Sequence, residues 1–450
     1  MPTLSITETG ARPRPDADNT DAIQEALDRC ARSGGGLVEV PPGVFRTGPI
    51  DLASGVELHL TRGAVLSFFD DPVRYPVAPT RWEGVECYAY RPLIGIAGSA
   101  DVAIRGDGVI DGCGTRWWST HAAIRAGELN PRSVPGVVGI QQANAGLPGD
   151  SGGGGRESGF LRPVLIGISG SSRVALEGFT ARNPPFWNTH VLYSSHVAVR
   201  QVSFESPADA PNTDGLDVDS SEHVTIDGCV LDVGDDCIVL KSGSGVDGRR
   251  VARPTHDVVV SRCRMVHGHG GVVIGSETAG GISDVRIDDC EFVDTDRGIR
   301  IKSRRGRGGA IDRIVASNLR MERVGCPLVV NLYYRTGVAE HDAVRTASLD
   351  PLPVDETTPS VSAIHVSRLT ARSVRYAAAV LYGLPESPLH DVTLDECTFE
   401  LDPHGEPGEP AMDFSGSRFS RSGIVARFAG DPSLRDVRVL GADRDRIDLT

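Results

Sequence analysis

Two short segments in the middle of the chain are rich in carboxylate side chains. The segment that begins at Asn212 contains Asp214, and a Gly-Asp-Asp tripeptide 21 residues further on contains Asp235 and Asp236. The chain already carries a formal net charge of −14, and carboxylates held close together repel, which raises the pKa of one member. Such a cluster offers a protonated acid beside ionised bases, the two states that acid–base cleavage of a glycosidic bond requires.

Other side chains that can bind or transfer protons follow in the next hundred residues. His269 lies in a Gly-His-Gly tripeptide, and Arg300 and Lys302 lie in Arg-Ile-Lys. Of the 46 basic residues only two are lysines, Lys241 and Lys302, and both fall in the stretch that holds the carboxylates. Generic surface aspartates are commonest in solvated turns. We therefore expect four further aspartates of this stretch to be solvated turn residues: Asp217, Asp219, Asp227 and Asp232.

The elements that must position these residues repeat along the chain. A short motif alternates apolar and polar residues, and its first apolar residues, here called anchors, lie 23 to 34 residues apart. The anchors are Val174, Val197, Val224, Val258, Val285 and Ile314, and weaker copies begin at residues 99, 361 and 389. Alternation at period two indicates half-buried strands. Short strands at this spacing predict a parallel β-helix, in which equivalent strands stack about 4.8 Å apart; a β-propeller repeat is longer.

The repeat converts sequence position into geometry. Asp235 and His269 each lie eleven residues after an anchor, so we expect them in one column of adjacent coils. Asp214 joins this column if the Pro-containing insertion before it is a loop, and Arg300 with Lys302 belongs to the coil after His269. The sequence therefore predicts one stripe of carboxylates flanked by a histidine and two cations.

The nine cysteines are predicted to be thiols. Cys229, Cys263 and Cys290 each lie five residues after an anchor, which favours a column of small buried side chains over disulfides. No pair of cysteines has zinc-like spacing. This usage is typical of a reducing compartment.

The ends of the chain differ from the middle. Residues 20–33 place Ile23, Ala26, Leu27 and Cys30 at helical spacing, with Asp21 and Gln24 as a capping box and a glycine run, 34–36, as the stop. A helix here would cover the open end of the solenoid. We expect a single all-β catalytic domain over 1–450, with a cap region at 1–50, coils at 51–400 and a C-terminal coil or cap at 401–450.

The four tripeptides, taken in order, carry a family resemblance. Asn-Thr-Asp at 212–214, Gly-Asp-Asp at 234–236, Gly-His-Gly at 268–270 and Arg-Ile-Lys at 300–302 resemble the signature motifs of polygalacturonases, the family 28 glycoside hydrolases. The resemblance extends to Asn-Pro-Pro-Phe-Trp-Asn-Thr-His, to Gly-Ser-Glu-Thr-Ala-Gly-Gly-Ile and to the N-terminal helix. It implies a right-handed parallel β-helix and hydrolysis of α-1,4 links between galacturonates, with inversion at the anomeric carbon.

The resemblance also implies roles for individual residues. Asp235 would be the general acid, Asp214 and Asp236 would hold and deprotonate the attacking water, and the acid and base would lie roughly 6.5–9.5 Å apart. His269 would help to set the protonation of the acid. The residues expected to bind substrate are Arg300, Lys302, Asn212, Tyr333, Tyr334 and His190. Core packing is an equal expectation for whichever of the two tyrosines points inward, and Arg304, Arg305 and Arg307 are expected in a solvated basic loop.

The expected partner is a galacturonate oligomer or polymer, with no cofactor and no metal. The acidic balance disfavours nucleic acid, and no apolar run is long enough to span a membrane. The first twenty residues lack a secretory signal, which favours a cytoplasmic protein; a secreted protein whose signal had been removed would begin alike. The absence of a signal suggests short imported oligomers as substrates, and hence exo action, in which product is released from one end of the chain. The Gly-rich loop 141–159 could block one end of the cleft, which would suit exo action.

Three alternatives remain open at this point. A rhamnogalacturonan-type hydrolase is a close relative of the predicted enzyme. A pectate lyase on the same fold would use calcium and abstract a proton. A non-catalytic carbohydrate-binding β-helix would bind sugar without turnover.

Overall fold

The computed structural model describes residues 3–14, 16–147, 155–443 and 448–449. The chain folds as a right-handed parallel β-helix with a short N-terminal helix, as the sequence predicts. It divides into two compact units. The first unit comprises Met1–Trp82, Glu86–Gly149 and Gly154–Asp235, and the second comprises Glu83–Val85, Asp150–Gly153 and Asp236–Thr450. Among the described residues, no helix combines the length and the apolar character needed to cross a bilayer.

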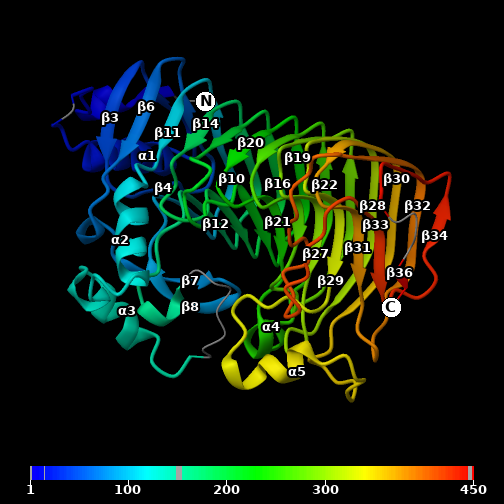
Figure 1. Cartoon of the computed structure of the whole chain (residues 1–450). Coiled ribbons are helices and arrows are strands. Elements are labelled where there is room, and N and C mark those ends of the chain that lie inside the picture. The colour runs from blue at the N-terminus through cyan, green and yellow to red at the C-terminus, as the bar shows by residue number, and fades with distance from the viewer. Residues whose placement is uncertain (1–2, 15, 148–154, 444–447, 450) are drawn as a thin grey trace. The chain divides into compact units, whose positions relative to one another are not determined.

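The first unit is a stack of parallel coils (Figure 1). Its longer sheet contains β1 (Thr3–Ser5), β2 (Gly36–Val40), β3 (Gly43–Thr47), β5 (Val56–Leu60), β6 (Ala64–Phe68), β10 (Ala100–Gly106), β11 (Val109–Asp111), β13 (Ser172–Glu177), β14 (Thr180–Arg182), β16 (Ser195–Arg200), β17 (Ser203–Glu205), β19 (Glu222–Asp227) and β20 (Val230–Val233). Its second sheet contains β4 (Ile50–Asp51), β9 (Ile94–Ala97), β12 (Ile166–Ser169), β15 (Thr189–Leu192) and β18 (Leu216–Asp219). The strands β7 (Val77–Trp82) and β8 (Val85–Tyr90) form a separate hairpin. The helices are α1 (Thr20–Arg32), α2 (Thr115–Arg125) and α3 (Val137–Ala143), with short 3₁₀ turns at Ile6–Thr9, Pro72–Arg74, Pro131–Ser133 and Arg156–Ser158.

The second unit repeats this coil architecture. Its longer sheet contains β22 (Thr255–Ser261), β23 (Arg264–His267), β25 (Ile282–Asp288), β26 (Glu291–Val293), β28 (Ala310–Glu322), β30 (Ser360–Val374), β32 (His390–Leu401), β34 (Ser433–Arg435) and β35 (Arg438–Leu440). Its second sheet contains β21 (Asp236–Lys241), β24 (Gly270–Ile274), β27 (Arg297–Lys302), β29 (Cys326–Asn331), β31 (Ala377–Tyr382), β33 (Ser422–Arg427) and β36 (Asp448–Leu449). The helices are α4 (Gly245–Val251) and α5 (Ala343–Ala347), with a 3₁₀ turn at Glu340–Asp342.

The predicted anchors are register partners. In the first unit Val174 pairs with Val197 and Val197 pairs with Val224, and in the second unit Val258 pairs with Val285 and Val285 with Ile314. All of these side chains are at most 1% exposed. The period-two alternation therefore marks the inner face of each coil, and burial of like residues in a column stabilises the stack.

In each coil the residue immediately before the anchor adopts a left-handed backbone conformation. The residue before each anchor has a φ between 51° and 59°, as at Arg173, His196, Asp257 and Asp284. A non-glycine residue rarely adopts this conformation. These residues lie inside β13, β16, β22 and β25. Because the conformation recurs at the same place in successive coils, the residues on either side of it keep their register.

The cysteine and helix predictions are confirmed with one correction. All nine cysteines are free, and Cys229, Cys263 and Cys290 are buried. The α1 helix buries Ile23, Ala26, Leu27 and Cys30, as predicted. The predicted capping box is wrong, because the helix begins after Asn19 and Gln24 instead binds the backbone N–H and C=O of Asp51 in β4, at 2.8 and 3.1 Å.

The loop 141–159 is partly structured. Its first residues continue α3, and a 3₁₀ turn covers Arg156–Ser158. Residues 148–154 of this predicted blocking loop lie outside the described residues.

Candidate active site

In the first unit, Asp214 and Asp235 come together. Asp214 is 4% exposed and precedes β18, and Asp235 is half-buried after β20. One carboxylate oxygen of each lies within 4.8 Å of the other. The distance is shorter than the roughly 6.5–9.5 Å expected of an inverting acid and base, so the separation does not itself argue for inversion.

The loop that carries Asp214 is held by a residue that the sequence analysis missed. Arg162 is fully buried and donates to Asn212 Oδ1 at 2.7 Å and to the carbonyl oxygens of Pro185 and Pro211 at 3.0 and 2.9 Å. Asn212 itself has a φ of 56°. The guanidinium therefore fixes the first residue of the Asn-Thr-Asp motif in a strained conformation, and nothing in the local sequence around Arg162 signals this.

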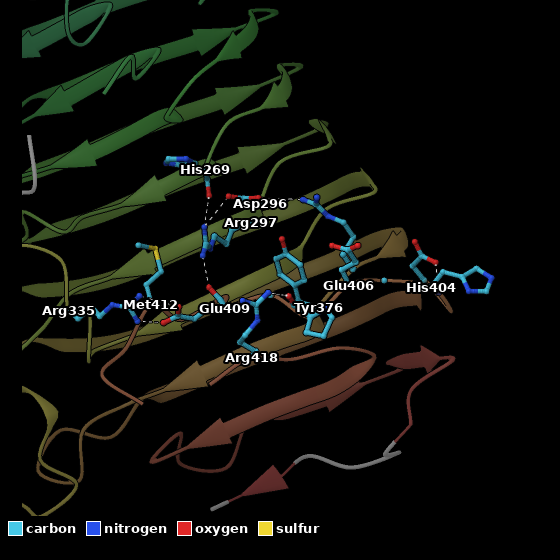
Figure 2. A pocket seen from close by; sticks show the side chains of 15 residues that line it. His269, Asp296, Arg297, Arg335, Tyr376, His404, Glu406, Glu409, Met412 and Arg418 are labelled. Carbon is cyan, nitrogen blue, oxygen red and sulfur yellow. Dashed lines mark hydrogen bonds and ion pairs between the residues drawn. The ribbon is translucent and has the colours of Figure 1, made fainter. Parts of the chain in front are cut away.

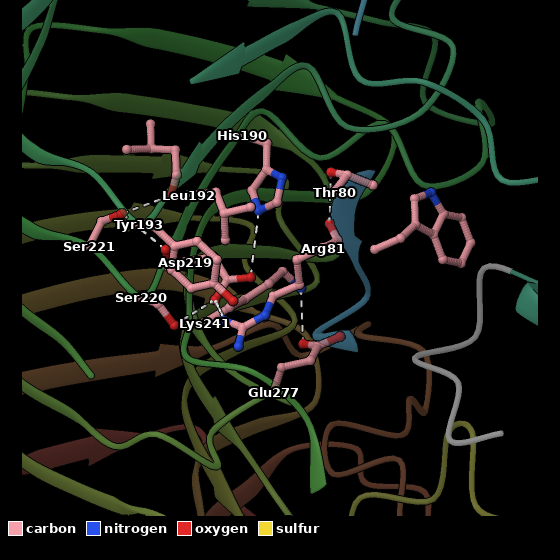
Figure 3. Close-up of polar contacts among 12 residues, drawn as sticks. Thr80, Arg81, His190, Leu192, Tyr193, Asp219, Ser220, Ser221, Lys241 and Glu277 are labelled. Atoms are coloured by element: carbon pink, nitrogen blue, oxygen red, sulfur yellow. Dashed lines mark hydrogen bonds and ion pairs between the residues drawn. The ribbon is translucent and has the colours of Figure 1, made fainter. Parts of the chain in front are cut away.

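The predictions for Asp217 and Asp219 are wrong, because both lie in β18 and are fully buried rather than solvated. Asp227 and Asp232 are half-buried and lie in the strands β19 and β20 rather than in turns, so the turn prediction is wrong for them too. Arg81, also fully buried, donates to Asp219 Oδ1 at 2.9 Å and to Ser220 Oγ at 2.7 Å (Figure 3). A buried carboxylate of this kind needs such a partner, because an unpaired charge in the interior is costly.

His190 lies in β15 and is 4% exposed. Its Nε2 is 3.5 Å from Asp219 Oδ2, and its ring packs edge-on against Trp187 with centroids 5.1 Å apart. It also lines a cavity of about 460 Å³ together with Thr80 and Leu192. Within the first unit the His190 side chain therefore lies next to the Asp219 carboxylate.

In the second unit, Asp236 is bound by both cations of the Arg-Ile-Lys motif. Lys302 Nζ donates to Asp236 Oδ2 at 2.6 Å, and Arg300 Nη1 donates to Asp236 Oδ1 at 3.4 Å. Burial alone would raise the pKa of Asp236, but Lys302 and Arg300 outweigh it and hold that pKa well below its usual range. Asp236 is therefore an ionised carboxylate at neutral pH.

The two predicted tyrosines differ. Tyr334 is 6% exposed, and its ring lies 5.5 Å from the Arg300 guanidinium and 5.3 Å from Lys302 Nζ. Tyr333 is 2% exposed and packs against Arg305 at 5.6 Å, and burial raises its pKa to about 12. Tyr334 thus belongs to the group around the Arg-Ile-Lys motif, and Tyr333 belongs to the core.

His269 lies on the exposed side of its coil. Asp236 pairs in register with Gly270, the residue that follows His269. His269 lines a cavity of about 700 Å³ in the second unit (Figure 2). Arg297 in this cavity donates to His269 O at 3.5 Å, and Met412 Sδ accepts from Arg300 at 2.9 Å.

A second acid in this unit, Glu277, was not predicted. It is 3% exposed, and Lys241 donates to its Oε2 at 3.1 Å. Burial would raise the pKa of Glu277, but Lys241, Arg307 and Lys302 lower it to about 2. The available signals were the Gly-Ser-Glu segment and the rarity of lysine, which marks both Lys241 and Lys302.

The basic loop after the Arg-Ile-Lys motif is not solvated. Arg304, Arg305 and Arg307 are at most 4% exposed. Arg305 makes two hydrogen bonds to Glu386, at 2.6 and 2.9 Å, which were invisible to local pattern analysis because the partners are 81 residues apart. The prediction of a solvated loop is wrong for all three arginines.

Comparisons with known proteins agree with this chemistry. The family model for glycosyl hydrolases family 28 matches residues 150–371. The chain is 30% identical over 393 residues to a protein of Vitis vinifera named "Probable polygalacturonase", covering 85% of this chain and 71% of that protein. It is 29% identical over 346 residues to an exo-poly-alpha-D-galacturonosidase of Dickeya chrysanthemi, covering 73% of this chain and 56% of the relative.

A solved structure shares the whole architecture. The hyperthermoactive exopolygalacturonase of Thermotoga maritima superposes with a TM-score of 0.74 at 27% identity, covering 98% of this chain and 92% of that one. The motifs, the coil register and these relatives lead to the same assignment. The chain belongs to family 28 of the glycoside hydrolases.

Proposed function

We propose that this glycoside hydrolase cleaves α-1,4-galacturonosyl links from the ends of polygalacturonate or oligogalacturonate chains, and that Asp235, Asp214 and Asp236 are its catalytic acids. The observation that carries the proposal is the pairing of Asp236 with Lys302 and Arg300 at 2.6 and 3.4 Å. Asp235, which precedes Asp236 in the chain, lies within 4.8 Å of Asp214 in the first unit.

In the proposed reaction a water oxygen attacks the anomeric carbon while the bond to the leaving oxygen breaks. Asp235 gives its proton to the leaving oxygen, and Asp214 and Asp236 hold the water and accept its proton. Because Asp236 is ionised, its carboxylate can bind the water and has no proton to donate. His269 would assist the acid, and inversion at the anomeric carbon is carried over from the family resemblance.

Substrate recognition rests on the cations. Arg300 and Lys302 present charge that a uronate carboxylate can bind, and Tyr334 lies against both. The names of the relatives, a galacturonosidase and an exopolygalacturonase, support galacturonate as the sugar and chain ends as the site of attack.

The lyase alternative is less favoured by the geometry. A calcium-dependent lyase needs carboxylate oxygens available for the ion, but both oxygens of Asp236 accept from cationic side chains. A rhamnogalacturonan-type hydrolase would differ in substrate, and a non-catalytic sugar-binding β-helix would show affinity without turnover. The same digestion assay distinguishes all three.

The test is digestion of polygalacturonate and of defined oligogalacturonates, with product sizing and proton NMR of the first anomer released. We expect a saturated terminal product of inverted configuration, unaffected by a chelator. Asp235→Asn should lower kcat at least a thousandfold. Asp107→Asn, at an exposed turn of the first unit, is the matched control and should retain full activity. An unsaturated product, or none, would refute the proposal.

A further inference from the structure

The outer face of the second sheet in the first unit becomes more buried from one strand to the next. In β12 the outward positions Gly167 and Ser169 are half-exposed. Their register partners in β15, His190 and Leu192, are each 4% exposed. The partners of those residues in β18, Asp217 and Asp219, are fully buried. Polar side chains on an outward face are buried only where another element lies over them.

Over β18 the covering element is β7 of the β7–β8 hairpin. Its residues Pro79 and Thr80 line one cavity with Gly167 and Ser169 of β12 and with His190 and Leu192 of β15, so a space remains between β7 and those two strands. Arg81, the next residue, pairs with Asp219 at 2.9 Å and lies over the Tyr193 ring at 4.8 Å (Figure 3). The side chains of this pair are both fully buried. Arg81 therefore attaches the hairpin to the outer face of the sheet.

The hairpin also contacts the loop of a proposed catalytic acid. Trp82 stacks on Phe186, with ring centroids 4.6 Å apart and planes at 14°, and its indole N–H donates to Arg162 O at 3.2 Å. Arg162 in turn holds Asn212, two residues before Asp214. The covered part of the face thus begins next to the Asp214 loop, and β15 is one strand spacing, about 4.8 Å, beyond β18.

We propose that the β7–β8 hairpin, attached through Arg81, is the barrier that restricts this enzyme to chain ends. This inference rests on the proposed function. A galacturonate chain lying along the outer face cannot continue past Asp214 over β18, because Arg81 of β7 occupies the surface at Asp219. The chain must end there, so cleavage releases a short product of fixed size.

The hairpin can be shortened without opening its base. Arg91 N–H donates to Pro76 O at 3.0 Å, so the two strands are already joined where they leave the coil. The test variant replaces residues 79–88 by Asn-Gly, a dipeptide suited to a two-residue turn. It also carries Asp219→Asn, so that no buried carboxylate is left without Arg81. Asp219→Asn alone, whose amide oxygen can still accept from the Arg81 guanidinium, is the matched control. Arg81→Gln, which removes the guanidinium that lies against Asp219 and Tyr193, is a milder variant that keeps the hairpin.

The assay compares product sizes from a defined octagalacturonate, and the loss of polygalacturonate viscosity against reducing ends formed. We expect the wild type and the Asp219→Asn control to release one short product from the first turnovers. The shortened variant should yield intermediate oligomers and halve the viscosity after at least fivefold fewer cleavages. Arg81→Gln should raise the fraction of intermediates at least tenfold above the wild type.

The outcomes separate the two proposals. If the wild type releases no uronate from any galacturonate chain, the proposed function fails and the inference falls with it. If the wild type is exo-acting but the shortened variant, folded by circular dichroism, keeps a single terminal product, the barrier is elsewhere. If the shortened variant does not fold, an unchanged product pattern in Arg81→Gln overturns the inference.

Discussion

Aspartates only a few residues apart have different environments in this protein, and their partners set what each can do. Asp236 is ionised because Lys302 and Arg300 bind both of its oxygens. Asp219, in the same acidic stretch of sequence, is paired with Arg81 and holds a hairpin in place. A carboxylate in a protein is therefore assigned a role by its neighbours and burial, and residue type alone does not decide it.

Replacement of Lys302 tests the electrostatic role of the Arg-Ile-Lys motif. Lys302→Met removes the stronger of two contacts that lower the pKa of Asp236, so that pKa rises and the carboxylate protonates at a higher pH. We expect kcat/KM to fall at least a hundredfold, and the acid limb of its pH profile to move to higher pH. Lys302→Arg should keep part of the wild-type kcat/KM and shift the acid limb less than Lys302→Met does. An acid limb that stays where it is in Lys302→Met would contradict the assignment.

Glu277 should stabilise the fold at neutral pH and lose that effect in acid. Its pKa in the folded protein is about 2, below the 4.5 of an unperturbed glutamate, so its contribution is complete above pH 4.5 and declines as the pH falls toward 2. Glu277→Gln should lower the free energy of unfolding by about 3 kcal/mol at pH 7 and by about 1 kcal/mol near pH 3.

Urea unfolding at the two pH values measures this difference. Glu128→Gln, at an exposed position of the first unit, is the control and should change neither value. An equal loss of stability at pH 7 and pH 3 would mean that Glu277 acts through packing and not through its charge.

At the scale of the element, the coil strands owe their stability to one face. In β22, Val260 is fully buried and Val259, its neighbour, is 37% exposed. Both are β-branched and suited to a strand, so intrinsic propensity cannot separate them. Burial can, because the inner face of each coil packs against the coils above and below it.

A pair of conservative substitutions isolates this effect. Val260→Ala removes two buried methyl groups and should lower the free energy of unfolding by about 2 kcal/mol. Val259→Ala, one residue away on the outer face, should cost less than about 0.5 kcal/mol. Chemical denaturation of both variants under one condition provides the comparison. Similar losses for the two would contradict the inward assignment of Val260, which follows the anchor Val258 at period two.

At the scale of the whole molecule, the chain is stabilised without disulfides. All nine cysteines are free, and only Cys113 is not buried. A reductant should therefore leave the melting temperature unchanged within about 1 °C, whereas loss of a native disulfide worth about 2–5 kcal/mol would shift it by several degrees.

Thiol labelling gives the complementary readout. In the native protein a bulky reagent should reach about one thiol, Cys113, and after unfolding it should reach all nine. Fast labelling of several native thiols would show that the interior column around Cys263 and Cys290 is open to solvent.

Much of this architecture could be predicted from local pattern. Val174, Val197 and Val224 align in the structure as counting predicted, because a period-two pattern is a local property that the coil repeats. The helix at 20–32 was found for the same reason, since its apolar spacing is local. The capping box failed because Gln24 finds a better partner in β4, which is distant in sequence.

The coil repeat, the anchors and the four motifs that carry the proposed catalytic and binding residues can be predicted from the amino-acid sequence alone. Which charges are buried, and which groups they contact, depends on the folded chain: Arg81 binds Asp219, 138 residues away, and Arg162 binds Asn212, 50 residues away. Strand periodicity depends only on residues that are close in sequence, whereas a buried ion pair depends on which distant segments pack together. For that reason the contact of the hairpin with β18 could be recognised only after folding.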